Sequence, residues 1–396
     1  MHRSDRLSAL PPYLFAEIDK SKREAITSGI DVIDMGIGDP DIPTPPEALN
    51  VMSSAIQKYA NKLYPPYGGT VDFRNSVATW YRRRSSIVLD PDTEVLALIG
   101  SKEGLAHLAF AVANPGDIVL VPDPEYPVYR NSTLLSGAVP YAMPLRVENG
   151  FLPIFDDIPH DVASRAVLMY LNYPNNPTGA VADLRFLRSA VEFARKYDII
   201  IAYDHAYSEL VFDGRRSPSI LEVEGSRELC VEFNSLSKIF NATGWRLAWA
   251  VGSREVLESL NSLKKNIDSG VFMAIQEAGA FALDNLIEAT SAKNVSIYEQ
   301  RRDVFVQTLR EGGWDVSPPH GTFYIWARIP GNSCKAAARL LRETGVVCVP
   351  GIGYGEYGEG YIRFALNLEV QRVAEAARRL SRAEFSCENG ETLVHS

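Results

Sequence analysis

Cysteine is scarce in this chain, and neither cysteine nor histidine is spaced as a metal site requires. The four cysteines, Cys230, Cys334, Cys348 and Cys387, include no C-x-x-C pair, and the six histidines include no H-E-x-x-H pair. Spacings of those kinds are the usual signs of bound zinc or of a redox-active thiol pair. We therefore expect no metal site, and we expect reduced thiols in a cytoplasmic protein.

The chain also lacks the long apolar run and the excess of positive charge that two other classes of protein need. No stretch approaches the roughly 18 apolar residues of a membrane span. The amino-terminal segment MHRSDRLSALPPYLF is polar and has no apolar core of the kind found in secretion signals. The formal net charge of −9 disfavours a nucleic-acid surface. We therefore expect a protein that binds neither membranes nor nucleic acids.

What the chain does contain is an alternation of short apolar runs with helical patterns. Apolar runs that predict strands lie at 118–121, 166–171, 198–203 and 247–252. Helical patterns such as 183–196 and 254–267 separate most of them. Continuous apolar strands are typical of a mainly parallel α/β sheet that is buried on both faces.

Beyond residue 285 the pattern changes to a smaller α+β unit. Its predicted elements are a helix at 287–311, a strand at 321–329, a helix at 333–344, a strand at 361–366 and a helix at 369–383. A length of 396 residues is compatible with two domains. We therefore predict a large domain over 47–285, and a small domain that joins 286–385 to the arm 1–46. The polar tail, 386–396, is expected to be disordered.

The stretch NSLSKIFNATGWR (234–246) places two cations close to short hydroxyls. Lys238 lies three residues after Ser235 and eight residues before Arg246. A phosphate between the cations would stabilise them, since Arg246 and Ser235 can bind it while Lys238 reacts with the group that carries it. Burial and a second cation lower a lysine pKa, as Schiff-base chemistry requires. From this stretch alone, a surface lysine in a polar loop is the alternative.

Two glycine-containing turns share features with known phosphate-binding motifs. At 95–113 an apolar strand passes through Gly100, Ser101 and Lys102 into a helix, whose exposed N–H groups favour an anion. The P-loop pattern is absent there, so an ordinary helix cap is the alternative. The hexapeptide GYGEYG (353–358) fits G-x-G-x-x-G, but it lies between two short strands and begins no helix. The dinucleotide fingerprint therefore fails, and we predict a loop.

Several motifs together resemble one known family. S-x-S-K followed by G-W-R resembles the lysine motif of the class I/II, fold-type I, pyridoxal-phosphate aminotransferases. N-N-P-T-G at 175–179, Asp204-x-Ala206-Tyr207 and Tyr361-Ile-Arg363 extend the resemblance, which covers about residues 10–383. The fold that it implies is α/β, with a mainly parallel seven-stranded sheet between helices in the large domain and a smaller α+β domain.

The resemblance implies a pyridoxal 5'-phosphate site and a role for each matching residue. Lys238 would bind the cofactor aldehyde and carry the proton. Asp204, at the end of an apolar strand, would pair with the pyridine nitrogen, while Asn176 and Tyr207 would hydrogen-bond the phenolic oxygen. Tyr126 would stack on the ring. The remaining cofactor contacts would come from Ser101, Lys102, Ser235 and Arg246.

The same resemblance implies the substrate contacts and a partner subunit. Arg363 would bind the substrate carboxylate, helped by the Gly38 backbone and Asn176. The family works as a homodimer, and Tyr64 resembles the tyrosine that reaches the phosphate in the neighbouring subunit. The substrates would be small molecules, an amino acid and a 2-oxo acid.

Each of these residues also has an ordinary explanation when it is taken singly. Asp204 can be a helix cap, Asn176 can serve a turn, and Arg363 can belong to a surface ion pair. Tyr126 and Tyr207 can be packing residues. Their occurrence in order, at strand ends where ligands bind in parallel sheets, favours the cofactor site.

Within the family, some stretches resemble the LL-diaminopimelate aminotransferases most. They are LPPYLFAEID (10–19), IGDPDIPTP (37–45), EVLALIGSKEGLAH (94–107), NIDSGVF (266–272) and GIGYGEYGEGYIRFAL (351–366). That resemblance implies transamination between LL-diaminopimelate and 2-oxoglutarate in lysine and cell-wall synthesis. A broad-specificity aspartate, alanine or aromatic aminotransferase, a β-lyase on the same fold, and a non-catalytic cofactor-binding regulator are the alternatives.

Overall fold

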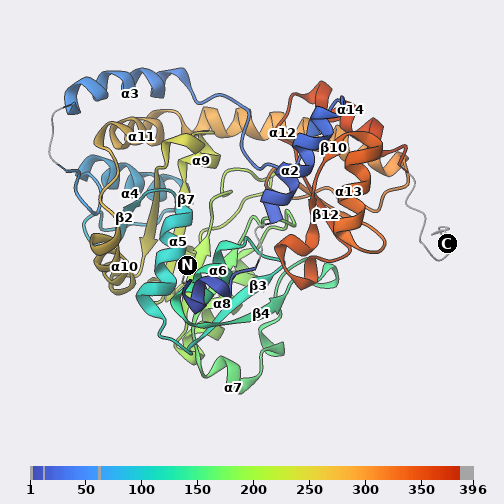
Figure 1. Ribbon diagram of the computed structural model, residues 1–396. Coiled ribbons are helices and arrows are strands. Elements are labelled where there is room, and N and C mark those ends of the chain that lie inside the picture. Colours follow the sequence, from blue (N-terminus) through green and yellow to red (C-terminus); the bar gives the residue numbers. More distant parts are fainter. Residues whose placement is uncertain (1–2, 12–13, 61–63, 384–396) are drawn as a thin grey trace.

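The computed structural model describes residues 3–11, 14–60 and 64–383. Two of the three sheets organise these residues, one of seven strands and one of three, and each is covered by helices (Figure 1). Separate clusters of buried apolar side chains pack against the two sheets. The two sheets therefore define a large and a small unit, whereas the exact domain limits stay a prediction.

The large sheet has the strand order β2-β8-β7-β6-β5-β3-β4. Its strands are β2 (Val95–Leu98), β3 (Ile118–Asp123), β4 (Val139–Pro144), β5 (Ala166–Asn172), β6 (Ile200–Asp204), β7 (Cys230–Ser235) and β8 (Ala248–Gly252). β8 is antiparallel to both of its neighbours, and the other pairings are parallel. The predicted mainly parallel seven-stranded sheet is confirmed.

Two strands of this sheet, β4 and β7, were not identified from the sequence. β4 is an edge strand that carries Pro140 and Pro144, and proline is tolerated at an edge although it weakens any strand signal. β7 includes Glu232 and Asn234, which are polar but buried. Because polar side chains interrupt its apolar pattern, β7 does not resemble the other buried strands.

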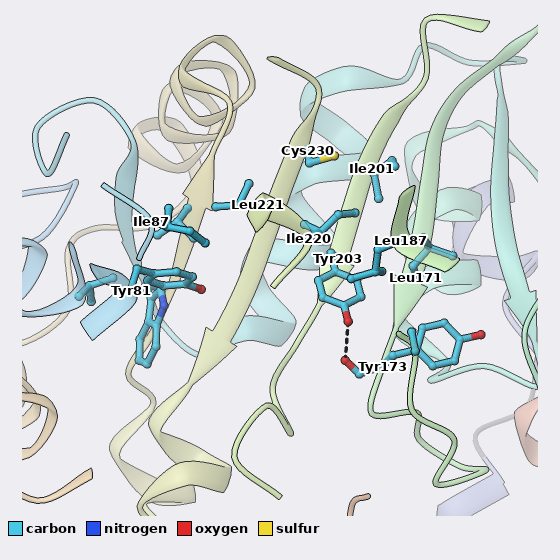
Figure 2. Close-up of a cluster of buried hydrophobic side chains, with 14 of the residues drawn as sticks. Tyr81, Ile87, Leu171, Tyr173, Leu187, Ile201, Tyr203, Ile220, Leu221 and Cys230 are labelled. Carbon is cyan, nitrogen blue, oxygen red and sulfur yellow. Dashed lines mark hydrogen bonds between the residues drawn. The ribbon is translucent and has the colours of Figure 1, made fainter. Parts of the chain in front are cut away.

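Helices cover the large sheet on both faces. One face packs against α5 (Ser101–Val112), α6 (Val128–Ser136) and α10 (Arg254–Ile267). The other packs against α4 (Val71–Ser85), α8 (Leu184–Tyr197) and α11 (Met273–Asn285), and α3 (Pro46–Tyr59) lies on α11. Figure 2 shows part of this second core, where the Tyr203 hydroxyl donates to the Tyr173 carbonyl at 2.9 Å. Burial on both faces explains the continuous apolar strands.

The small unit has an antiparallel sheet of order β11-β12-β9. Its strands are β9 (Tyr324–Arg328), β11 (Val349–Pro350) and β12 (Tyr361–Ala365), and its helices include α12 (Ile287–Glu311), α13 (Ser333–Thr344) and α14 (Val370–Leu380). The arm joins this unit, since β1 (Ile33–Asp34) pairs in parallel with β10 (Val346–Val347). Helix α2 (Leu14–Thr27) contacts α13. The tail expected to be disordered, 386–396, lies outside the described residues.

None of the helices among the described residues combines the length and apolar character needed to cross a membrane.

Candidate active site

A cavity of about 570 Å³ lies between the two units, at the carboxyl ends of β5, β6 and β7. All but one of the predicted site residues line it: Gly38, Ser101, Lys102, Tyr126, Asn176, Asp204, Tyr207, Ser235, Lys238, Arg246 and Arg363. The strand-end position follows from parallel topology, which brings the carboxyl ends of neighbouring strands to one edge of the sheet. The exception, Tyr64, is 87% exposed.

Lys238 lies on the short helix α9 (Leu236–Ile239), which directly follows β7. Its Nζ donates to the Gly38 carbonyl oxygen at 2.8 Å. Burial lowers the Lys238 pKa to about 8, and the charges of Arg363 and Arg246 act in the same direction, whereas Asp39 opposes them. A lysine amine with a pKa near neutrality is a competent nucleophile and proton carrier.

Asp204 ends strand β6 and is only 5% exposed. Its Oδ2 accepts a hydrogen bond from the Tyr129 hydroxyl at 2.8 Å, and its Oδ1 accepts one from the Ala206 N–H at 3.3 Å. Burial raises the Asp204 pKa to about 6, although both hydrogen bonds act to lower it. A buried carboxylate of this kind is stabilised by a cation, and the protonated pyridine nitrogen of the expected cofactor would be one.

Arg363 projects from β12 of the small unit into the cavity. Its Nη1 donates to Asn176 Oδ1 at 3.0 Å, and its Nη2 donates to the Gly36 carbonyl oxygen at 2.7 Å. Its Nε is buried and has no hydrogen-bond partner among the residues that the structure describes. A buried guanidinium with an unused donor and no carboxylate partner fits a ligand carboxylate.

The turn before α5 and the guanidinium of Arg246 form a cradle for an anion. Gly100 has φ +80°, and a Cβ at this position would lie 2.0 Å from Arg246 Nη2. Arg246 can approach the turn only because residue 100 is glycine. Nearby, Ser235 Oγ accepts from the Ser237 N–H at 3.1 Å, while Ser237 Oγ is buried with no partner in the described part of the chain.

These groups fit pyridoxal 5'-phosphate. The cradle supplies backbone and guanidinium donors for the phosphate, with Ser101 at the first position of α5. Lys102 Nζ lies 5.8 Å from the centre of the Tyr126 ring, so the phosphate cradle adjoins an aromatic face. The unpartnered Ser237 hydroxyl gives the cradle one more donor.

Three residues that hold these side chains in place were not predicted from the sequence: Tyr129, Asn172 and Tyr324. Tyr129 donates to Asp204, and Asn172 Nδ2 donates to the Asp204 carbonyl oxygen at 2.8 Å. The hydroxyls of Tyr207 and Tyr324 lie 3.1 Å apart, and burial raises the Tyr207 pKa well above its ordinary value. Asn172 follows an apolar strand, which is a usable signal. Tyr324, inside a predicted strand, has the pattern of a core residue and offers none.

One group of potential metal ligands lies outside the cavity. Single ligand atoms of Glu103, His107 and Asp268 lie within 4.8 Å of one another. The Lys264 ammonium lies among them, 2.8 Å from Glu103 Oε1 and 3.1 Å from Asp268 Oδ2. A cation of the chain itself therefore already pairs with both carboxylates.

Comparisons with known proteins agree with the geometry of the cavity. The family described as aminotransferase class I and II matches residues 30–380. The LL-diaminopimelate aminotransferase of Halothermothrix orenii is 51% identical over 387 residues, covering 97% of this chain and 99% of that protein. The enzyme of the same name from Moorella thermoacetica is 50% identical over 384 residues, covering 96% and 98%. The substrate-bound structure of BacF from Bacillus subtilis has a TM-score of 0.91 at 35% identity, covering 96% of this chain and 97% of that one.

Proposed function

Since the chain belongs to the class I and II aminotransferase family and is therefore a pyridoxal 5'-phosphate-dependent transaminase, we propose that its substrate pair is LL-diaminopimelate and 2-oxoglutarate. The observation that carries this proposal is the similarity along almost the whole chain to two enzymes of that name, each about half identical. The activity would serve the synthesis of lysine and of the cell wall.

Several residues of this chain are suited to hold the cofactor. Lys238 would bind its aldehyde, Asp204 would pair with the pyridine nitrogen, and Asn176 and Tyr207 would hydrogen-bond the phenolic oxygen. Tyr126 would provide the stacking face. The phosphate would be held by Ser101, Lys102, Ser235 and Arg246. These assignments are supported by the convergence of all these side chains on one cavity.

When bound, pyridoxal phosphate withdraws electrons from the substrate and so makes its Cα proton acidic. Lys238 Nζ is the group that takes this proton and later returns it, because its pKa of about 8 leaves part of the amine neutral near pH 7. Arg363, which lines the cavity, binds the substrate α-carboxylate, with Asn176 and the Gly38 backbone beside it. This grip orients Cα toward Lys238.

We also propose a homodimer in which Tyr64 binds the cofactor phosphate of the neighbouring subunit. Tyr64 does not line the cavity of its own subunit and is 87% exposed, as a residue that acts in a partner would be. Tyr64→Phe should raise the dissociation constant for the cofactor without changing the mass measured by light scattering.

We place the protein in the cytoplasm, in keeping with the free thiols of Cys230, Cys334 and Cys348.

The test is an amino-donor screen with the purified protein, read as glutamate formed from 2-oxoglutarate. LL-diaminopimelate should be the preferred donor, and the rates with aspartate, alanine and aromatic amino acids should be lower by at least about tenfold. A tenfold ratio corresponds to a difference of about 1.4 kcal/mol in transition-state binding. Similar rates for all donors would instead indicate broad specificity. Ammonia released in place of glutamate would indicate a β-lyase.

A lysine variant tests the assignment of the site independently of the donor. Lys238→Ala should lower turnover at least about 1000-fold and abolish the absorbance band of the lysine-bound cofactor, because both the attachment point and the proton carrier are lost. Lys335→Ala, which changes an exposed lysine on α13, is the matched control. An active Lys238→Ala enzyme would refute the assignment.

A further inference from the structure

The hexapeptide GYGEYG binds a side chain of the large unit. It fits the G-x-G-x-x-G pattern of nucleotide-binding proteins, but it lies between two strands and begins no helix. The N–H groups of Glu356 and Tyr357 donate to Asp123 Oδ2 at 3.1 Å and to Asp123 Oδ1 at 3.0 Å. Asp123 ends β3 and is only 1% exposed. The short helix η7 (Glu356–Gly358) of the small unit therefore rests on the end of a large-unit strand (Figure 1).

Close approach of other atoms explains two glycines of the hexapeptide, and at one of them the approaching group is this carboxylate. Gly355 has φ +128°, and a Cβ there would lie 2.1 Å from Asp123 Oδ1. A Cβ at Gly358 would lie 2.1 Å from the Gly351 carbonyl oxygen. In dinucleotide-binding proteins, glycines in this pattern let the backbone approach a pyrophosphate. Here the anion is a carboxylate of the same chain.

The contact between the units continues to the walls of the cavity. The Glu125 N–H donates to the Tyr354 carbonyl oxygen at 2.6 Å. On the small-unit side, the Tyr354 ring lies 5.0 Å from the guanidinium of Arg363, and both residues line the cavity. Arg363 also lies 4.1 Å from the centre of the Tyr324 ring, so any shift of the turn at 354–357 would move one of the two rings against which Arg363 packs.

The charge of Asp123 suits this contact. Burial raises its pKa to about 6, so that it is a carboxylate at neutral pH. Besides the two N–H groups, Arg130 Nη2 lies 3.8 Å from Asp123 Oδ2, while Arg130 Nε binds Glu125 Oε1 at 3.1 Å. Hydrogen bonds to an ionised acceptor are roughly twice as strong as neutral ones. The two bonds from Glu356 and Tyr357 to Asp123 are of this kind, and they join the two units.

We propose that Asp123 is a positioning residue for transamination. Its carboxylate holds the turn at 354–357 against the end of β3. Tyr354 and Arg363 are thereby kept in the geometry that binds the substrate carboxylate. The proposal rests on the proposed role of Arg363. It assigns a task to a glycine-rich motif that the cofactor site leaves without one.

The test is Asp123→Asn in the cofactor-loaded enzyme, which keeps the shape of the side chain and removes its charge. KM for the amino donor should rise about tenfold, whereas kcat should change less than about threefold, since substrate orientation is loosened while Lys238 and Asp204 are untouched. The dissociation constant for the cofactor should stay within twofold of the original. Amide hydrogen exchange at 351–358 should become faster.

Matched variants separate this role from a general loss of stability. Asp117 also accepts a hydrogen bond from a backbone N–H group, that of Asn114 at 2.7 Å, but it lies at the opposite end of β3. Asp117→Asn removes this carboxylate and should leave KM for the amino donor unchanged. Gly355→Ala should reproduce the rise in KM, and combining it with Asp123→Asn should add little, because both changes break one contact. Gly331→Ala, at φ +75° with no atom within 4 Å, controls for backbone strain alone.

Contrary outcomes are clear. Unchanged exchange at 351–358 in Asp123→Asn, equal effects of Asp117→Asn and Asp123→Asn, or a fall in kcat with KM unchanged would each overturn the proposal. The exchange measurement needs no substrate, and KM is compared on whichever amino donor the enzyme turns over. Failure of the proposed substrate pair would therefore leave this test intact.

Discussion

Two glycine turns of this chain lie beside charged side chains, Gly100 beside Arg246 and Gly355 beside Asp123, and they differ in what the turn faces. The turn at Gly100 faces the cavity, where Arg246 completes it. The turn at Gly355 faces Asp123, whose carboxylate already takes up its N–H groups. In both turns a positive φ and a near-contact exclude any side chain. Local backbone chemistry therefore makes an anion site, but only the surroundings decide whether a ligand or the protein fills it.

The largest effect that separates the two turns is expected from Gly100→Ala. A methyl group there would displace Arg246 and strain the backbone, so the dissociation constant for pyridoxal phosphate should rise about 100-fold, whereas KM for the amino donor should change little. Titration of the cofactor-free protein measures the first quantity and steady-state kinetics the second. Gly355→Ala should give the reverse pattern, and the same pattern in both variants would refute the distinction between the turns.

A pH profile gives the next largest effect, because a titrating amine lies beside the first turn only. The Lys238 pKa is lowered to about 8, so the neutral amine that attacks an aldehyde increases about tenfold per pH unit below 8 and little above it. The rate of cofactor uptake by the cofactor-free protein should follow this curve when it is measured by absorbance from pH 6 to pH 10. A rate that still climbs tenfold per unit between pH 9 and pH 10 would mean that the lysine is not perturbed. Gly355→Ala should leave the profile unchanged.

The smallest effect concerns a second carboxyl group beside the second turn. Burial raises the Glu125 pKa to about 8 from an ordinary value of 4.5. Between these pH values the unfolded chain has released a proton that the folded protein retains, so this group lowers stability as pH rises from about 4.5 to 8. Glu125→Gln should remove that dependence and raise the melting temperature at pH 8 by about 2 °C, with little change at pH 5. A melting temperature lowered equally at both pH values would contradict this account.

Much of the fold and the site could be predicted because strand ends meet at one edge of a parallel sheet. The apolar runs at 166–171 and 198–203 became β5 and β6, and their register places Asn172 opposite Asp204. Polar residues at the ends of these two predicted strands were therefore expected to converge, and both line one cavity. Lys238 follows β7, the next strand in the sheet, which was not identified from the sequence, so its place in the site was expected from the family resemblance.

Other parts of the site could not be predicted because their sequence pattern is that of a core. Tyr129 and Tyr324 lie in segments whose aromatic residues pack inside the protein, and nothing in those segments marks a hydroxyl that faces a ligand site. Strand β7 was missed for the opposite reason. Its Glu232 is buried and forms hydrogen bonds with Tyr81 and His205. Because a charged residue usually indicates an exposed position, the sequence did not mark this position as part of the core.

The sequence by itself determined the alternation of apolar strands with helices, and with it the edge of the sheet where Asn172 and Asp204 lie. That result needs only periodicity and parallel topology. Tertiary structure alone decided which residues of the small unit face that edge. Arg363 bonds Asn176 across 187 positions of the chain, and Tyr357 bonds Asp123 across 234. Such pairings depend on how two separately formed cores pack together, and no local pattern of residues encodes that packing.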